Sequence, residues 1–207
     1  MLTTATRVYD KIRIQMEDII WQKSLRKTAT IVLNVIYRRG FPMPTAVYEH
    51  FTKSDEIKED DFGDESFLTK YMVPEAGKCL VDVGASIGLW TIYVAKQGRQ
   101  VYCFEPSPKA YAILKSRTQA YPNVHAYPYA LGDKDRVGRL GLAAFSLSGS
   151  MDAELKGLHK GGTIDIAVRS LDSLAIPDIG IIKIDTEGYE TPILEGAKGT
   201  IQKIDHA

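Results

Sequence analysis

The chain has 207 residues, of which 44% are hydrophobic and 25% charged, and its 26 basic and 26 acidic side chains give a formal net charge of zero. This composition is typical of a globular domain and excludes a disordered chain, which would combine low hydrophobicity with high net charge. The neutral balance also gives no reason to expect nucleic acid as a bulk electrostatic partner, since that footprint is strongly basic.

The first part of the chain has an uneven distribution of charge. Residues 1–39 carry eight basic and three acidic side chains, whereas residues 49–65 carry eight acidic and two basic ones. Apolar side chains recur at helical spacing near the start: Val8, Ile12, Met16, Ile19 and Ile20. We therefore expect residues 1–65 to form a helical extension and an acidic linker, with the helices packed on the domain or on a second copy of the chain. A helix that docks on a membrane surface or on another partner is the alternative.

Several features bear on the cellular compartment. The longest apolar run, residues 29–37, has about half of the roughly 20 residues that a membrane span needs. Charged side chains also stand where a signal peptide needs its apolar region. The two cysteines, Cys79 and Cys103, have no Cys or His at metal-ligand spacing and are expected to be buried thiols. The sequence thus predicts a cytoplasmic protein without an integral membrane segment or a metal site.

From residue 79 onward, short apolar runs alternate with helical patterns. The expected strands are Cys79–Val83, Val101–Phe104, Val124–Tyr127 and Ile181–Ile184, and the expected helices are Leu89–Gln97, Ser107 to about Tyr121, and one from about Thr191. Continuous apolar strands separated by helices indicate a parallel sheet that is covered on both faces. The segment 136–169 is rich in Gly and Ser, and we expect it to form an antiparallel excursion.

The strongest signal for a binding site follows the first of these strands. The turn Gly84–Gly88 joins a buried strand to a helix. Gly84 lets the chain turn sharply, while Gly88 lets a ligand approach the backbone or lets the helix pack closely. The helix N-terminus offers N–H groups and a positive dipole to a polar ligand. Glu105 ends the next strand, 23 residues after Asp82, where a carboxylate is placed to accept hydrogen bonds from the ribose hydroxyls of an adenosine ligand.

The composition of this turn favours one adenosine cofactor over another. The dinucleotide fingerprint has a second glycine at the position of Ser86, and that glycine lets a pyrophosphate contact the backbone. Its absence, together with Asp82 just before the turn, favours S-adenosylmethionine (SAM), which has a cationic amino-acid end. An NAD(P)-dependent oxidoreductase is the alternative, and it usually needs a Tyr-x-x-x-Lys pair near the reacting atoms. Tyr111 and Lys115 have that spacing but lie on the helix after the ribose carboxylate.

Two blocks of the sequence resemble a known family. Asp82–Gly88 resembles motif I of class I SAM-dependent methyltransferases in the DVGAxIG form of the FkbM family, and Lys183–Glu190 with Leu194–Ala197 is similar to its KIDxEGxE…LxGA block. Ser170–Leu174 resembles the LD element that precedes this block. The resemblance covers about residues 66–201. It implies a Rossmann-like α/β methyltransferase fold and transfer of a methyl group to a hydroxyl of a sugar, lipid-linked or natural-product acceptor.

The resemblance also implies roles for individual residues. The residues expected to bind SAM are Asp82, Gly84, Ala85, Ser86, Gly88, Glu105 and Asp133. Asp133 follows the third strand, where the adenine lies in this fold, although a solvated turn aspartate fits the pattern equally. Asp185 ends the fourth strand, beside the transferable methyl group. Asp185 and Glu187 are the candidate catalytic residues, because the acceptor must be held in line and must lose its proton; alternatively, Glu187 caps the following helix.

The given sequence ends before the last strands of the family pattern. Class I methyltransferases have three more strands and a helix after the position of Ile201. We therefore expect residues 66–207 to form a SAM-binding domain that lacks its C-terminal strands and exposes the edge of the fourth strand. A cofactor-binding remnant without catalysis is the alternative reading of this ending.

Overall fold

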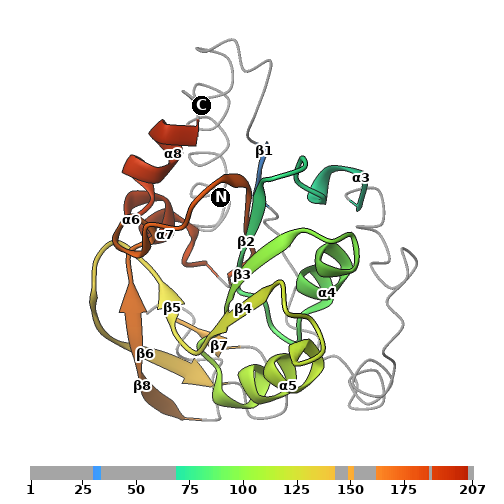
Figure 1. The fold of residues 1–207 in the computed structure, drawn as a ribbon. Helices are drawn as coiled ribbons and strands as arrows, with labels where there is room; N and C mark the ends of the chain where they lie inside the picture. Colours follow the sequence, from blue (N-terminus) through green and yellow to red (C-terminus); the bar gives the residue numbers. More distant parts are fainter. Residues whose placement is uncertain (1–29, 34–68, 143–148, 152–161, 187, 205–207) are drawn as a thin grey trace, which may run out of the picture.

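A computed structural model describes residues 30–33, 69–142, 149–151, 162–186 and 188–204 of the chain. Their central feature is a parallel sheet of five strands in the order β1-β9-β2-β3-β4 (Figure 1). These strands are β1 (Thr30–Leu33), β2 (Cys79–Val83), β3 (Gln100–Phe104), β4 (Val124–Tyr127) and β9 (Ile179–Ile184). The chain proceeds from β2 to β3 and β4 on one side and later returns to place β9 on the other side of β2. Ligands of such sheets bind beyond the carboxyl ends of the strands at this point of reversal.

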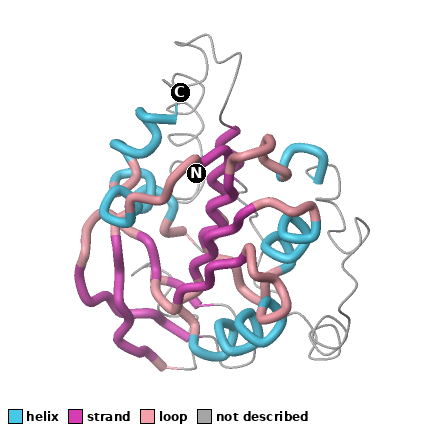
Figure 2. The backbone as a smooth tube through the Cα atoms, in the orientation of Figure 1, coloured by secondary structure: helices cyan, strands magenta, loops and turns pink. Residues whose placement is uncertain are grey.

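Helices cover both faces of the parallel sheet, as the continuous apolar strands predict (Figure 2). The helices are α3 (Thr69–Met72), α4 (Leu89–Lys96), α5 (Pro108–Thr118), α6 (Leu171–Leu174), α7 (Glu190–Glu195) and α8 (Lys198–Ile204). Residues of α4 and α5 pack with Leu80 and Val101 in one core, whereas residues of α6, α7 and α8 pack with Val81 and Ile182 in the other. No helix among these described residues is long and apolar enough to span a membrane.

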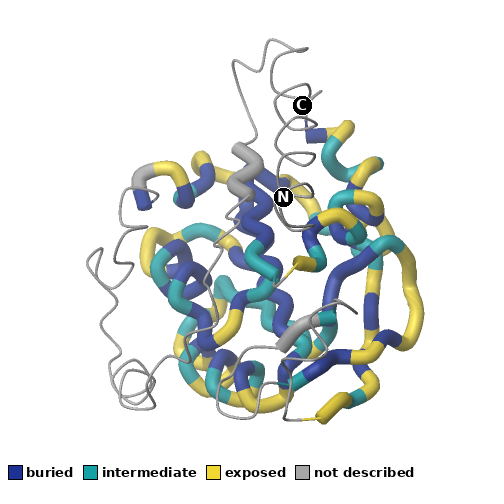
Figure 3. Tube along the Cα trace, turned by 180° about the vertical axis from the view of Figure 1, so that it is seen from behind, coloured by how far each residue is buried: buried dark blue, intermediate teal, exposed yellow. Residues whose placement is uncertain are grey.

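The expected strands and helices are confirmed to within a few residues. Helix α4 ends at Lys96 and is followed by Gly98, which has a φ of 73° and so stops the helix as predicted. Helix α5 starts at Pro108 after Ser107, but it ends at Thr118, three residues earlier than expected. Strands β2 and β9, in the middle of the sheet, are buried from end to end (Figure 3). Cys79 and Cys103 are buried free thiols, as expected.

The segment between β4 and β9 forms a second, smaller sheet. Its strands are β5 (Ala130–Leu131), β6 (Arg136–Leu142), β7 (Gly149–Ser150) and β8 (Thr163–Arg169), in the order β5-β8-β6-β7. Strands β6 and β8 are antiparallel, which confirms the predicted excursion. This sheet has its own small core around Leu140 and Val168. It also brings β5 and β6 to the carboxyl ends of β2 and β3, where they help to form a pocket.

Strand β1 departs from two expectations. Its residues lie within the segment predicted to be helical, yet β1 pairs with β9 from Thr30 opposite Ile181 to Leu33 opposite Ile184. The sequence Thr-Ile-Val-Leu is rich in β-branched residues, which favour strands. Because β9 lies between β1 and β2, its edge is paired and not exposed. The rest of residues 1–65, including the predicted amphipathic helix and the expected contact with a second copy, lies outside the described residues.

Candidate functional site

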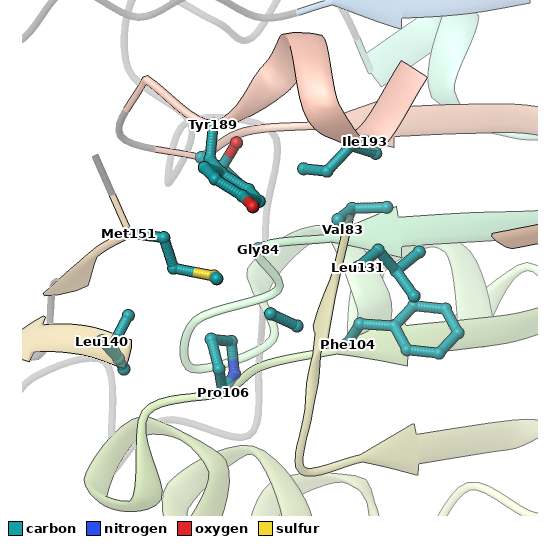
Figure 4. Close-up of a pocket in the computed structure, with 11 residues that line it drawn as sticks. Val83, Gly84, Phe104, Pro106, Leu131, Leu140, Met151, Tyr189 and Ile193 are labelled. Atoms are coloured by element: carbon teal, nitrogen blue, oxygen red, sulfur yellow. The ribbon is translucent and has the colours of Figure 1, made fainter. Parts of the chain in front are cut away.

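A pocket opens beyond the carboxyl ends of β2 and β3 (Figure 4). It lies where the strand order of the parallel sheet changes direction, between β9 and β3. About 360 Å³ of empty space, open solvent included, lies among its lining residues. Its walls come from both sheets and from the segment that leads into α7, and they include Gly84, Pro106, Leu131, Leu140, Tyr189 and Ile193. A mostly apolar lining with a few polar groups is typical of a site for a small organic ligand.

The turn after β2 lies directly against the end of β9. Gly84 has a φ of 74°, and a Cβ atom there would lie 2.1 Å from the backbone oxygen of Asp185. The backbone N–H of Asp185 donates to the oxygen of Val83 at 3.0 Å. Gly88 has a φ of 86°, and a Cβ atom there would lie 2.6 Å from Cδ1 of Leu114. Gly84 therefore permits contact between two strand ends, whereas Gly88 permits the packing of α4 on α5.

The N–H groups of the turn bind to β3 and to Glu105. The N–H groups of Gly84 and Ala85 donate to the oxygen of Phe104 at 3.0 and 3.1 Å. The N–H of Ser86 donates to Oε2 of Glu105 at 2.8 Å. The side chain of Ala85 is buried in the core, whereas Ser86 is exposed. The structure thus joins the glycine turn and the predicted ribose carboxylate, and it leaves Ala85 only its backbone for contact with a ligand.

Glu105 is a buried carboxylate that accepts hydrogen bonds from two backbone N–H groups. Its Oε1 accepts the N–H of Ser107 at 2.8 Å, and its side chain is almost completely removed from solvent. Burial raises the pKa of Glu105 to about 7, although the hydrogen bonds from Ser107 and Ser86 partly oppose this rise. Each carboxylate oxygen can accept more than one hydrogen bond, and each accepts one backbone N–H here.

A buried ion network lies behind the glycine turn. Nζ of Lys183 lies 3.0 Å from Oδ1 of Asp82 and 3.5 Å from Oδ2 of Asp185. The hydroxyl of Thr91 on α4 donates to Oδ2 of Asp82 at 2.7 Å. Burial lowers the pKa of Lys183, but the attraction of Asp82 and Asp185 outweighs burial and raises it. The two carboxylates thus favour the charged form of Lys183, and Asp82 contacts protein groups and does not line the pocket.

Sequence reasoning assigned no separate role to Lys183. Its signal in the sequence is a lysine within the otherwise apolar strand Ile-Gly-Ile-Ile-Lys-Ile. Its partner becomes evident only from the strand register, which places Asp82 directly opposite Lys183. A charged residue in a central strand needs a buried counter-ion, and Asp82 supplies it.

The two predicted catalytic residues have different outcomes. The side chain of Asp185 is 36% exposed and follows the end of β9, beside the glycine turn. Glu187 lies outside the described residues. Glu190 is buried and accepts hydrogen bonds from the hydroxyl of Thr186 at 3.1 Å and from the N–H of Gly188 at 3.3 Å. Glu190 thereby organises the connection that holds Tyr189 at the pocket.

Asp133 lies in a polar cluster at the rim of the pocket. Its Oδ1 is 3.5 Å from Nε of Arg136, and the guanidinium of Arg136 donates a hydrogen bond to the hydroxyl of Tyr189. The sequence reasoning gave no role to Arg136 or Tyr189, because their contact depends on the second sheet folding back over the parallel one. Among the described residues, no group of three or more His, Cys, Asp or Glu side chains is placed to hold a metal ion.

Comparisons with known proteins found similarities in sequence and in structure. Hexuronic acid methyltransferase AglP of Haloferax volcanii is 24% identical over 154 residues, which are 70% of this chain and 61% of that protein. The chain thus spans less than two thirds of the length of this relative. The solved structure of methyltransferase FkbM from Methylobacillus flagellatus KT has a TM-score of 0.44 and 16% identity, and covers 77% of this chain and 45% of that one. A SAM-dependent methyltransferase from Aquifex aeolicus has a TM-score of 0.34 and 15% identity, over 49% of this chain and 54% of that one.

The family assignment follows from the sequence profile. The methyltransferase FkbM domain matches residues 82–206, which include the glycine turn, Glu105, the second sheet and the end of β9. Because this match covers more than half of the 207 residues, the chain belongs to the methyltransferase FkbM domain family.

Proposed function

We propose that the chain is a SAM-dependent methyltransferase that acts on a hydroxyl of a sugar, lipid-linked or natural-product acceptor. Family membership supports methyl transfer. The observation that supports SAM most directly is the hydrogen bond between the N–H of Ser86 and Glu105, which joins the glycine turn to a carboxylate beside an apolar pocket. Such a pair offers hydrogen-bond acceptors for a ribose and an apolar surface for an adenine.

Several described residues are placed to bind different parts of the cofactor. Glu105 would hold the ribose, and Pro106 and Leu131 would pack against the base. Ser86, Gly84 and the backbone of Ala85 would line the cofactor, while Asp82 and Gly88 support the turn from behind. Asp133 stands at the rim of the pocket, where it would accept a hydrogen bond from the adenine amino group.

The chemistry requires one new bond and one proton acceptor. Held by Glu105 and the Gly84 turn, SAM would supply an electrophilic methyl group on a sulfonium, which would pass to the acceptor oxygen and leave the neutral thioether SAH. Asp185 is exposed enough to take the proton of the acceptor hydroxyl. The strand ends and the pocket wall hold the acceptor in line with the methyl group, which reduces the entropic part of the barrier.

Cofactor binding gives the direct test. S-adenosylhomocysteine (SAH) at 100 times its Kd should stabilise the native chain by about 2.7 kcal/mol. This corresponds to a rise in Tm of about 5–10 °C for a protein of this size, measurable by differential scanning fluorimetry. NADH at the same concentration should leave the Tm unchanged. A rise with NADH and none with millimolar SAH would favour the oxidoreductase alternative.

The acceptor is proposed to carry a carboxylate, as in a uronic acid. The relative from Haloferax volcanii is named for hexuronic acid. In this chain, Arg136 is two and four residues before Gly138 and Leu140 on β6, so these residues share one face of the strand. Leu140 lines the pocket, and Arg136 contacts Tyr189 at its rim. A guanidinium at this position can bind a carboxylate with two hydrogen bonds.

Arg136→Gln should therefore lower kcat/KM for methyl glucuronoside by about tenfold, within the range of a lost charge-assisted hydrogen bond. The same variant should change kcat/KM for methyl glucoside by less than about threefold. Arg139→Gln is the matched control, because Arg139 lies on the opposite face of β6 and is 69% exposed beside Asp165. Equal losses with both sugars would argue against a carboxylate contact.

A further inference from the structure

The ammonium group of Lys183 joins three parts of the proposed cofactor site. Its Nζ lies 3.0 Å from Oδ1 of Asp82, 3.2 Å from the backbone oxygen of Gly84 and 3.5 Å from Oδ2 of Asp185. The oxygen of Gly84 accepts a hydrogen bond from this ammonium, and the two carboxylates form ion pairs with it. The side chain of Lys183 is 3% exposed, which leaves no open position for a further ligand. Lys183 therefore acts on the site through its three partners.

The strand register explains why one lysine can reach all three oxygens. Asp82 on β2 and Lys183 on β9 are paired residues of neighbouring parallel strands. Asp185 comes two positions after Lys183 and shares its face of the sheet. Gly84 is two positions after Asp82, and the absence of its side chain allows the backbone oxygen of Asp185 to approach. The two strand ends are thus linked by their backbones and by one cation.

The charges of the three side chains are unequally exposed. Asp82 is completely buried and Lys183 almost so, whereas Asp185 is 36% exposed. The ammonium compensates the buried charge of Asp82, as a buried carboxylate requires. Two carboxylates and one ammonium leave one net negative charge. The exposed member of the triad, Asp185, lies between β9 and Thr186, and its backbone packs against Gly84; Thr186 and Gly84 both line the pocket.

We propose that Lys183 is a positioning residue that fixes the carboxylate of Asp185 beside the Gly84 turn, where its negative charge faces the sulfonium of the cofactor. This inference rests on the proposed function, because it places SAM in the pocket beyond the ends of β2 and β3. The site then favours a ligand with a positive charge at the reacting position over the neutral thioether product. Lys183 thereby links cofactor selection and the orientation of the proton acceptor.

If Lys183 has a purely structural role, its removal should affect ligand binding differently than if it positions Asp185. If Lys183 were only the counter-ion of Asp82, removal of both charges together would leave the site unchanged. The double variant Lys183→Met with Asp82→Asn removes this buried ion pair and keeps similar volumes. Asparagine at position 82 still offers an oxygen to the hydroxyl of Thr91, which now donates to Asp82 at 2.7 Å.

The test compares two ligands by isothermal titration calorimetry. SAH is neutral at sulfur, whereas sinefungin carries an amine on a carbon that replaces the sulfonium. The unmodified chain should bind sinefungin about tenfold more tightly than SAH. Asp185→Asn and the double variant should both reduce this preference to about twofold, while the double variant keeps its SAH affinity within about threefold. Lys198→Met, which removes an exposed lysine of α8, should keep the full preference.

The outcomes separate the two proposals. A double variant that keeps the tenfold preference would show that Lys183 is only a counter-ion, and it would overturn the inference while leaving the cofactor assignment intact. An unmodified chain that binds neither SAH nor sinefungin would overturn the proposed function itself. If the double variant does not fold, Lys183→Arg decides, because it keeps the buried charge but moves its donors. That variant should lose most of the preference, and an unchanged preference would contradict the proposal.

Discussion

Replacing Asp185 by asparagine is expected to lower turnover by about 100-fold or more, the range for loss of a general base. The substitution keeps the volume of the side chain and removes the carboxylate that takes the proton. It leaves Lys183 with Asp82 and the oxygen of Gly84, so the buried ammonium retains two partners and the fold should persist. SAM affinity should fall by no more than about fivefold, the amount given by the lost charge preference. The measurement is kcat with labelled SAM at saturating acceptor, with binding followed by calorimetry.

Two comparisons make this result specific. Asp165→Asn removes an exposed carboxylate that pairs with Arg139 on the second sheet, and it should leave kcat unchanged. Glu187→Gln tests the other candidate base: a large loss there, with a normal Asp185→Asn variant, would transfer the role to Glu187. If Asp185→Asn weakens SAM binding far more than fivefold while kcat at saturating SAM is normal, Asp185 belongs to the cofactor site.

Glu105→Ala is expected to weaken SAM by about 10- to 100-fold, because each hydrogen bond to a charged acceptor contributes roughly 1.5–3 kcal/mol. The effect should depend on pH, since burial raises the pKa of Glu105 to about 7. Ribose hydroxyls donate to the ionised carboxylate, so affinity should rise as the pH increases from 6 to 8 and level off above the pKa. Below the pKa, the slope approaches tenfold per pH unit. Calorimetry across this range measures the affinity, and buffers of different ionisation enthalpy report the proton released on binding.

Glu105→Gln is the control for the pH dependence. It keeps one hydrogen-bond acceptor but cannot ionise, so its affinity for SAM should be flat between pH 6 and 8. An identical slope in both proteins would assign the titration to another group. The raised pKa also has a consequence for folding: the native state holds a proton that the unfolded chain releases between about pH 4.5 and 7. The contribution of Glu105 to stability therefore declines as the pH rises through this window.

The sequence could predict most elements of the parallel sheet because each is a local pattern. The positions of Gly84 and Glu105 just after strands β2 and β3 were also predictable, since each follows a local apolar run; their roles toward a cofactor stay predictions. The contact between Gly84 and Asp185 depends on β9 lying beside β2, and the two residues are about 100 positions apart. The partner of Lys183 likewise depends on the register of two strands, and register is not a local property.

Two other features could not be derived from local patterns. The run that contains Thr30–Leu33 is short and apolar, and such a run is ambiguous between a buried helix and a strand. Its pairing with β9 decides in favour of a strand. The approach of Arg136 to Tyr189 requires the second sheet to close over the pocket, and these residues come from β6 and from the connection before α7.

The position of β9 between β1 and β2 sets the order in which this fold can assemble. Pairing of Thr30 with Ile181 closes a loop of about 150 residues, so the sheet has a high contact order and should form slowly. At usual rates of synthesis, β1 leaves the ribosome roughly 8–30 s before its partner. During that interval β2 also has an unpaired edge, because its second neighbour is the same late strand. Until residues 179–184 emerge, β1 thus has no strand partner in this sheet and β2 has one open edge, which chaperones can bind.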